Sequence, residues 1–230
     1  MIFCLGQVQE KCIKQNVPLY MVFIDFTKAF DAVSRQGLWS VLKKYGCPDK
    51  FVNIIKSLHD GMQASVTMCN TISKGFQVTN GVKQGCVLAP NLFSIYLAAM
   101  LEVAIKGTTE AVYIQTRREA DLFNVSQLKA RTKTSLVVIR VLLFADDSAL
   151  VSHSATDMQV LVDKFAEAAS QFSLKINIKK TECLYQPPKY LSVATPTPIM
   201  WTTSRSQCAE ISPIWAVRSQ NPQVSTKKSL

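Results

Sequence analysis

Apolar and polar positions alternate along the chain in segments that predict a mixture of helices and strands. Residues 19–26 form a nearly unbroken run of β-branched, aromatic and other apolar side chains, which indicates a buried strand. Apolar residues then recur at helical spacing over 38–45 and again over 51–58, where Asp49 can cap the second helix. The pattern therefore predicts one strand followed by two helices, with Asp25 near the carboxyl end of the strand.

The middle of the chain predicts a hairpin, a loop and a long buried helix. Residues 62–68 alternate in polarity and residues 75–79 are short and extended, so we expect these two segments to pair. A loop bounded by glycine is predicted over 80–90, and residues 92–105 have the Leu, Ala and Met spacing of a buried helix. The polar, basic stretch over 107–135 gives no clear assignment.

The second half of the chain predicts a pair of strands that carries two acids at its turn. Residues 136–144 are strand-like and run into Asp146 and Asp147, after which the strand pattern resumes. An apolar helix face follows over 158–172, and then a short strand near 174–178. In this order the elements predict an α+β sandwich.

Composition separates the chain into two parts. Residues 187–230 hold six of the nine prolines, twelve Ser or Thr and a single acid, Glu210, and no helical or strand period survives there. We therefore predict a folded unit over 1–186 and a disordered tail over 187–230, because such a tail cannot offset chain entropy by burial. The apolar content of 48% supplies ample material for a core in the folded unit.

Charge and cysteine content narrow the functional classes. The chain has 26 Lys and Arg against 16 Asp and Glu, a net charge of +10 that favours a polyanionic partner such as nucleic acid. The seven cysteines include no CxxC pair and only His59 and His153 are available, so the spacing of a structural zinc site is missing. An odd cysteine count argues against a disulfide scaffold and predicts an intracellular setting, cytoplasmic or nuclear, not secretion. No signal-peptide pattern and no run of 18 apolar residues is present, so we expect no membrane partner.

Three carboxylates carry the candidate chemistry. Asp25 ends a buried strand, and Asp146 and Asp147 lie at a strand turn, so two such strands side by side would bring the acids to one edge of the sheet. Carboxylate oxygens suit Mg²⁺. Two ions roughly 3.5 to 4 Å apart can activate an attacking hydroxyl and stabilise a leaving pyrophosphate, which indicates phosphoryl transfer to a growing strand. The alternative is ordinary turn and cap chemistry, because Asp bonds its own backbone in turns.

Four segments in order resemble motifs from the reverse transcriptase palm of LINE-type, non-LTR retrotransposons. They are FIDFTKAFDAVSR at 23–35, GVKQGCVLAPNLFSIYL at 81–97, FADD at 144–147 and SLKINIKKTE at 173–182. Each is moderately specific alone, but four in family order argue strongly against chance. The resemblance covers about residues 7–186. It implies a polymerase palm, an antiparallel sheet with helices on one face, that performs RNA-directed DNA synthesis from dNTPs on an RNA template and a DNA primer.

The resemblance implies roles for the residues that match the first and third motifs. Asp25 and Asp146 match the two principal metal ligands and Asp147 matches a third acid, so two Mg²⁺ ions, or Mn²⁺ in their place, are expected there. Phe26 would add its backbone carbonyl. Phe30 matches the aromatic that packs under the incoming sugar and excludes a 2′-hydroxyl, which predicts a preference for dNTPs. The alternative for Phe30 is a plain core aromatic.

The second and fourth motifs imply further substrate contacts. Gln84 and Gly85 match a contact with the nucleotide and the template, where glycine permits close approach of the backbone. A simple turn glycine is the alternative. Lys180 matches a lysine that helps the leaving pyrophosphate as a proton donor or charge partner, and a solvated surface charge is its alternative.

The sequence also departs from the family pattern. Only the last few residues of the preceding fingers segments are recognisable, and residues 187–230 resemble neither the primer-gripping hairpin nor the helical thumb. These departures predict a palm fragment with weak or no activity. The alternatives are a catalytically dead palm that binds nucleic acid and the non-functional product of a decayed retroelement.

Overall fold

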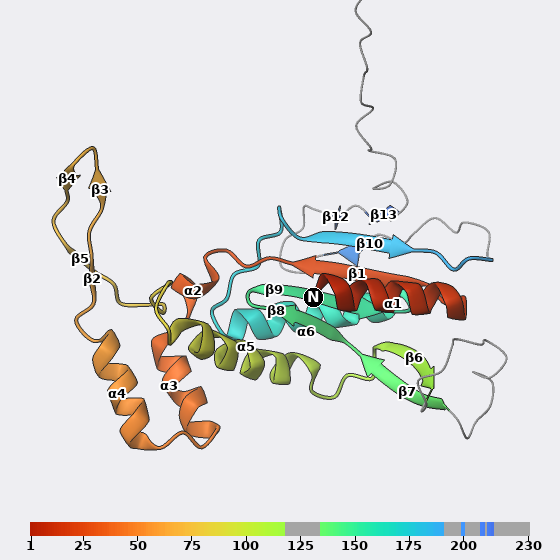
Figure 1. Cartoon of the computed structure of the whole chain (residues 1–230), viewed down its shortest axis with the longest axis horizontal. Coiled ribbons are helices and arrows are strands. Elements are labelled where there is room, and N and C mark those ends of the chain that lie inside the picture. Colours follow the sequence, from red (N-terminus) through yellow and green to blue (C-terminus); the bar gives the residue numbers. More distant parts are fainter. Residues whose placement is uncertain (118–133, 191–198, 201–207, 210, 214–230) are drawn as a thin grey trace, which may run out of the picture.

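The computed structural model describes residues 1–117, 134–190, 199–200, 208–209 and 211–213. At its centre lies a sheet with the strand order β13-β10-β1-β9-β8, in which β1 is antiparallel to both of its neighbours and β13 is parallel to β10 (Figure 1). The bounds of these strands are β1 Leu19–Ile24, β8 Val141–Phe144, β9 Asp147–Ser152, β10 Glu182–Gln186 and β13 Ile211–Pro213.

Helices and, within the described residues, four small strand pairs accompany this sheet. The helices are α1 Ile2–Gln15, α2 Ala29–Ala32, α3 Arg35–Lys44, α4 Asp49–His59, α5 Ala89–Ile105 and α6 Ala155–Gln171. The small pairs are β2 Gln63–Ala64 with β5 Phe76–Gln77, β3 Thr67–Met68 with β4 Thr71–Ile72, β6 Val112–Arg117 with β7 Thr134–Ile139, and β11 Ile199–Met200 with β12 Cys208–Ala209. The first two pairs form an arm that projects from the body beyond α4 (Figure 1).

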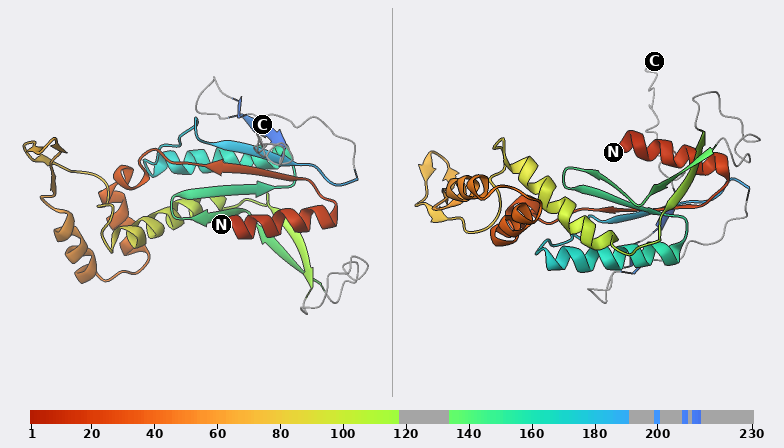
Figure 2. Two further views of the ribbon diagram at one scale, coloured as in Figure 1. Left: turned by 45° about the horizontal axis from the view of Figure 1, so that its top comes forward. Right: turned by 90° about the horizontal axis from the view of Figure 1, so that it is seen from below.

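Alternation along β1 divides the core into two clusters. Tyr20, Val22 and Ile24 join the larger cluster, to which α5 and α6 contribute, and we call this side of the sheet the helix face. Leu19 and Met21 join a smaller cluster with α1 and β6, and we call that side the α1 face. Figure 2 shows the same division, with α1 on one side of the sheet and α5 and α6 on the other. The predicted α+β fold is therefore confirmed, although helices cover both faces of the sheet instead of one and β13 runs parallel to its neighbour.

Several predicted elements are confirmed near their expected bounds. The apolar run over 19–26 forms β1, and the helical spacings form α3, α4, α5 and α6. The hairpin predicted over 62–79 is present as two successive short pairs that share one arm. Asp49 does not cap α4, because Pro48 occupies the cap position and the Asp49 carboxylate instead pairs with Lys43 at 2.7 Å.

One helix and one strand differ from the prediction. Helix α1 was not expected, because Gly6 interrupts a pattern whose apolar side is otherwise Leu5, Val8 and Cys12. The strand predicted over 136–144 changes partner at Arg140, so that β7 pairs with β6 whereas β8 pairs with β9.

No strand forms over 174–178. That segment makes a single bridge between Ile176 and Phe26, and the strand itself lies later, at β10. The sequence ECLYQ of β10 begins and ends with polar residues and gives no clear strand pattern. The strand forms because it pairs with β1, which lies far away in the chain.

The division at Gln186 and the disorder of the tail stay predictions. Of residues 187–230 the structure describes 187–190 and the short strands β11, β12 and β13. Strand β13 pairs with β10, and Ile199 is buried in the larger cluster. The rest of the predicted tail lies outside the described residues. Among the helices that are described, none is long and apolar enough to cross a membrane.

Candidate active site

Strand register brings the three predicted acids to one end of the sheet. β1 and β9 pair Tyr20 with Ser152 and Ile24 with Ser148, and continuing this register by one residue sets Asp25 opposite Asp147. In the β8–β9 hairpin Phe144 pairs with Asp147, which leaves Ala145 and Asp146 as the turn, with Ala145 at φ 55°. The strand-end and turn positions expected for these acids are therefore those that the structure shows.

The backbone around Asp25 is held by the segment that follows α6. Asn177 N donates to the Asp25 carbonyl at 2.8 Å, and Thr27 N donates to the Lys175 carbonyl at 2.8 Å. The chain then turns within this segment, where Lys180 N donates to the Asn177 carbonyl at 3.1 Å. These bonds place Lys180, from the fourth motif, beside the first motif.

One oxygen of the Asp25 carboxylate lacks a hydrogen-bond donor in the described part of the chain. Among the residues that the structure describes, none donates a hydrogen bond to the buried Oδ2 of Asp25, and the nearest cation is Lys180 Nζ at 3.7 Å, beyond hydrogen-bonding distance. The Lys180 side chain is 70% exposed, so water screens its charge strongly. A buried carboxylate oxygen without a donor is costly unless a cation approaches it. This donor chemistry fits a hard divalent ion.

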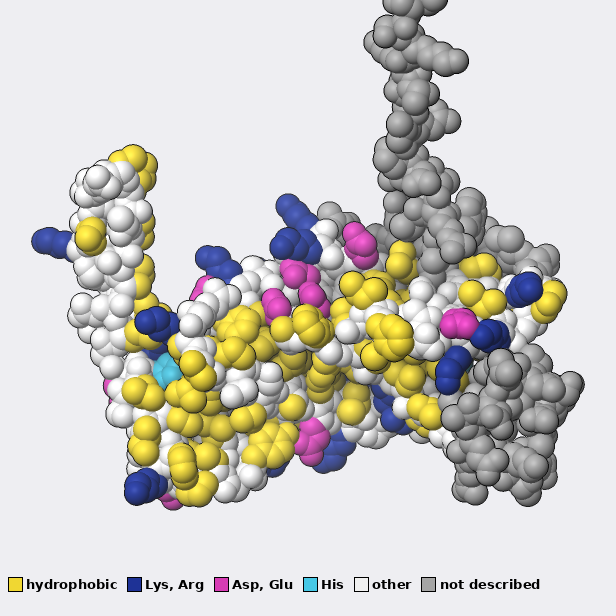
Figure 3. All heavy atoms as spheres, in the orientation of Figure 1, with side chains coloured by type: hydrophobic (Ala, Val, Ile, Leu, Met, Phe, Trp, Pro, Cys, Tyr) yellow, Lys and Arg dark blue, Asp and Glu magenta, His cyan; other side chains and the backbone are white. Residues whose placement is uncertain are grey.

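The other two acids are more open to solvent. Asp146 is half-buried and Asp147 is exposed. Within the described part of the chain, no three His, Cys, Asp or Glu side chains stand together closely enough to hold a metal ion. The strand register therefore gathers the acids at one sheet end without converging their side chains on one point. Figure 3 shows acidic side chains gathered near the place where β1 leaves the sheet, with Lys and Arg beside them.

The two phenylalanines of the first motif differ in their surroundings. Phe26 is buried and stacks on Phe165 with a ring-centroid distance of 6.0 Å. Phe30 is half-buried, and its ring stacks on Phe93 of α5 at 4.5 Å. Helix α5 thus braces Phe30 from behind and leaves part of its ring open to solvent. Phe30 packs against the core but is not sealed in it.

The loop of the second motif lies directly on the first motif. Val82 N donates to the Phe30 carbonyl at 3.0 Å, and Gly81 N donates to the Val33 carbonyl at 2.9 Å. Gln84 and Gly85 are exposed, and Gly85 has φ 81° with open space where a Cβ would stand. A ligand could therefore approach the backbone at Gly85, as the sequence predicts.

Sequence reasoning missed Gly81 as the glycine that the fold itself requires. A Cβ on Gly81 would lie 2.7 Å from Asp31 Cα and 2.9 Å from the Phe30 carbonyl oxygen, and its φ is 79°. The signal was present, because Gly81 and Gly85 bracket the GVKQG segment. The guanidinium of Arg35, the last residue of the first motif, also bonds the Gly81 carbonyl, at 2.9 Å.

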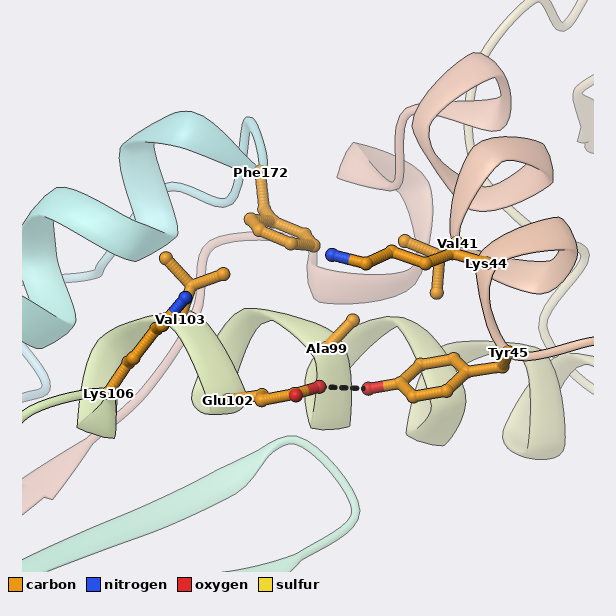
Figure 4. Close-up of a pocket in the computed structure, with 8 residues that line it drawn as sticks. All are labelled: Val41, Lys44, Tyr45, Ala99, Glu102, Val103, Lys106 and Phe172. Carbon is orange, nitrogen blue, oxygen red and sulfur yellow. Dashed lines mark hydrogen bonds between the residues drawn. The ribbon is translucent and has the colours of Figure 1, made fainter.

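A pocket among the helices lies apart from these residues. It has a volume of about 120 Å³ and opens between α3, α5 and Phe172 (Figure 4). Tyr45 donates its hydroxyl hydrogen to Glu102 at 2.9 Å along one side, and this bond raises the pKa of Tyr45. None of the residues assigned to the predicted site lines this pocket. The candidate chemistry therefore belongs to the end of the sheet where Asp25, Asp146 and Asp147 lie, which we call the open sheet end, and not to this pocket.

Comparison with protein families gives a match over most of the chain. The model of the family described as reverse transcriptase (RNA-dependent DNA polymerase) matches residues 5–195. The retrovirus-related Pol polyprotein from type-2 retrotransposable element R2DM of Drosophila melanogaster is 28% identical over 161 residues, which cover 70% of this chain and 13% of that protein. The RNA-directed DNA polymerase from mobile element jockey of Drosophila funebris is 30% identical over 165 residues, which cover 69% of this chain and 15% of that protein.

Solved structures share the fold at low identity. The apo telomerase of Candida tropicalis, truncated from its C-terminal domain, matches with a TM-score of 0.54 and 12% identity, over 87% of this chain and 36% of that one. The telomerase of Candida albicans, in complex with a TWJ fragment of telomeric RNA, matches with a TM-score of 0.54 and 11% identity, over 85% of this chain and 30% of that one. The chain thus spans a minor part of the length of the proteins it matches.

Proposed function

This chain belongs to the reverse transcriptase family, and on that basis we propose that its open sheet end is the catalytic palm of an RNA-directed DNA polymerase. The reaction would add dNTPs to the 3′-hydroxyl of a DNA primer on an RNA template. The observation that carries the proposal is the buried Oδ2 of Asp25, which has no hydrogen-bond donor among the described residues and only a long ion pair with Lys180 at 3.7 Å, at the strand end that Asp146 and Asp147 share. An oxygen of this kind is costly to the fold and is explained by a cation that it binds in use.

Reverse transcriptases generally use divalent metal ions, and we assign Asp25, Asp146 and Asp147 as the residues that would hold two Mg²⁺ ions, or Mn²⁺, with the Phe26 carbonyl as a further donor. When bound, such ions activate the primer hydroxyl and stabilise charge on the leaving pyrophosphate. The Asp146 and Asp147 side chains are half-buried and exposed, so they have room to rotate towards Asp25.

The remaining residues of the site would bind and orient the substrate. The Lys180 ammonium lies beside Asp25, where it can neutralise charge on the pyrophosphate or donate a proton to it. The Phe30 ring, braced by Phe93, would form the wall that rejects a ribose 2′-hydroxyl. The exposed backbone at Gln84 and Gly85 would lie against the nucleotide and the template.

Nucleic acid would bind across the same open end of the sheet. The net charge of +10 supports a polyanionic partner, and contacts from Lys and Arg to phosphates would make the affinity fall as salt rises. We propose an RNA template and a DNA primer as the partners, inside the cell, in the cytoplasm or the nucleus.

Calorimetric titration of Mg²⁺ and Mn²⁺ into the chain tests the metal assignment. We expect the wild type to bind both ions and Asp146→Asn to bind them at least about tenfold more weakly, because a ligand carboxylate loses its charge. Asp157→Asn is the matched control, since Asp157 lies in the first turn of α6, beyond the other end of β9. Equal binding by the wild type and Asp146→Asn would contradict the assignment.

Primer extension on an RNA template tests the activity itself. The wild type is expected to show weak dNTP incorporation at most, because the sequence matches only part of the family pattern. Asp146→Asn should abolish whatever incorporation is measured, while Asp157→Asn leaves it unchanged. Salt-dependent binding of a primer–template duplex without any extension, in a chain that binds Mg²⁺, would instead favour a palm that binds nucleic acid and is catalytically dead.

A further inference from the structure

A single guanidinium, that of Arg35 in the first motif, bonds both the start of the second-motif loop and the end of α4. Arg35 Nε donates to the Gly81 carbonyl at 2.9 Å, and Nη1 donates to the His59 carbonyl at 2.8 Å. Nη2 donates a longer bond of 3.4 Å to the Asn80 carbonyl. The start of the second-motif loop and the end of α4 therefore share one charged donor group.

The carbonyls that Arg35 holds belong to a tightly docked piece of backbone. Gly81 lies so close to Asp31 that a Cβ would stand 2.8 Å from the Asp31 carbonyl oxygen. Val82 N bonds the carbonyl of Phe30 itself, at 3.0 Å. Any shift at Gly81 and Val82 thus changes the position of the loop relative to the Phe30 ring. Gln84 follows two residues later.

The chemistry of Arg35 suits this task. Its side chain is partly buried, and burial lowers the pKa of its guanidinium while the charge of Asp60 opposes that change. An arginine remains charged at neutral pH all the same, and its bonds to carbonyls are charge-assisted. A lysine cannot replace the planar fork that reaches three carbonyls at once.

We infer that Arg35 is a positioning residue, which sets the separation between the Phe30 ring and the Gln84–Gly85 backbone and thereby governs how tightly a dNTP is held and how well a ribonucleotide is rejected. The inference rests on the proposed function, because that function assigns the nucleotide to these two surfaces. Arg35 acts through the loop and touches no reacting atom in this scheme.

Hydrogen exchange in the full chain tests whether Arg35 holds the loop in place, a role we call the Arg35 clamp, without reference to activity. In Arg35→Gln we expect the amide hydrogens of Gly81 and Val82 to exchange at least about tenfold faster than in the wild type, because the loop loses its charged anchor. Arg140→Gln is the matched control, since the partly buried Arg140 bonds the Thr108 carbonyl at 3.3 Å, outside this loop. Unchanged exchange in Arg35→Gln would overturn the inference.

Nucleotide kinetics test the consequence. We expect Arg35→Gln to raise KM for dNTPs about tenfold, to change kcat by less than about threefold, and to narrow the preference for dNTPs over rNTPs, because the chemical groups stay in place while the binding surface loosens. Arg35→Lys should lie between the wild type and Arg35→Gln, since it keeps the charge and loses the fork. If circular dichroism shows that Arg35→Gln does not fold, the same measurements are made on Arg35→Lys.

The outcomes separate this inference from the proposed function. Faster exchange with unchanged KM and unchanged discrimination, in a chain whose wild type extends primers, would make Arg35 a merely structural residue and overturn the inference. Absence of any dNTP binding or extension by the wild type would overturn the proposed function and the positioning role with it. The exchange rates of Gly81 and Val82 would still decide whether the clamp itself exists.

Discussion

The two faces of the central sheet are built from the same strands but differ in what covers them. On the helix face, Tyr20, Val22 and Ile24 of β1 enter the larger cluster with α5 and α6. On the α1 face, Leu19 and Met21 meet only the smaller cluster under α1 and β6. By strand alternation Asp25 and Asp147 belong to the α1 face, beyond the reach of that cluster. One face therefore supplies most of the burial, and the other leaves its strand end open for charged groups.

Two neighbouring polar atoms make the same contrast. Asp25 Oδ2 and Ser148 Oγ are both buried without a hydrogen-bond partner. Asp25 lies on the open end, where a cation from solution can reach it. Ser148 is 1% exposed and shares the helix face with Leu150, where no ligand can relieve it. The comparison teaches that position decides what a missing hydrogen bond means, because a cation can compensate the Asp25 oxygen at the sheet end, whereas the Ser148 hydroxyl facing the core only lowers stability.

The largest effect should follow from Asp25→Asn. Any primer extension that the wild type performs should be abolished, because divalent ions contribute several kcal/mol to stabilising the transition state. The free energy of unfolding without metal should stay equal or rise slightly, since the variant removes a partly buried charge whose Oδ2 accepts no hydrogen bond and pairs only with the exposed Lys180 at 3.7 Å. Urea unfolding with and without Mg²⁺ measures this. Added Mg²⁺ should stabilise the wild type but not the variant. A large loss of stability in the metal-free variant would show that the Asp25 charge stabilises the fold, and would contradict the contrast between the two faces.

Core truncation should distinguish the two faces. Leu150→Ala on the helix face should lower the free energy of unfolding by about 3–5 kcal/mol, and Leu19→Ala on the α1 face by about 2–3 kcal/mol. Both leucines are buried to the same degree, at 1% and 0% exposure. The difference is expected because α1 can settle onto the smaller cluster and partly fill the space. Equal losses in urea unfolding would show that the two faces pack equally well.

Thiol reactivity should report local opening of each face. Burial raises the pKa of Cys12 from 9.0 to about 11 and that of Cys183 from 9.0 to about 12. At pH 8 both should react with iodoacetamide at least about a hundredfold more slowly than the exposed Cys4 and Cys69, because so little thiolate forms. Cys12, on the buried side of α1, should react before Cys183. Mass spectrometry of alkylated peptides measures the order.

The raised pKa values of these thiols predict that the free energy of unfolding falls at alkaline pH. Because the folded thiols hold their protons to a higher pH than unfolded ones, the unfolded chain loses protons first as pH rises. The contribution of Cys12 is fully present below pH 9 and is lost between pH 9 and about 11. Cys12→Ala should remove part of that alkaline loss, and an unchanged pH profile in the variant would contradict the assignment.

The smallest effect should come from Ser148→Ala. Removing a buried hydroxyl that lacks a partner should raise the free energy of unfolding by about 0.5–1 kcal/mol. Ser152→Ala is the matched control, because Ser152 is equally buried but its Oγ bonds the backbone of Ser154, as donor and as acceptor, at 3.3 Å. That control should lose about 1 kcal/mol. Thermal unfolding of both variants measures the difference, and a loss in Ser148→Ala would show that its hydroxyl has a partner.

Much of the fold and the position of the candidate site could be read from the sequence. The apolar run of β1, the helical spacings of α3 to α6 and the acids at a strand end and a turn are local patterns, which short-range propensity and periodicity determine. Four motifs in order were sufficient to indicate the family that the comparison with residues 5–195 then showed. The roles of the individual site residues stay predictions.

Tertiary structure alone decided the features that depend on distant partners. The change of partner at Arg140, the replacement of a strand at 174–178 by β10, and the docking of α1 despite Gly6 all follow from pairing and packing between segments far apart in the chain. The importance of Gly81 depends on how closely it approaches Asp31, a distance that no local pattern encodes. Local propensity sets which elements can form, but the choice of neighbour is a competition for burial and hydrogen bonds across the whole chain, and only the folded molecule settles it.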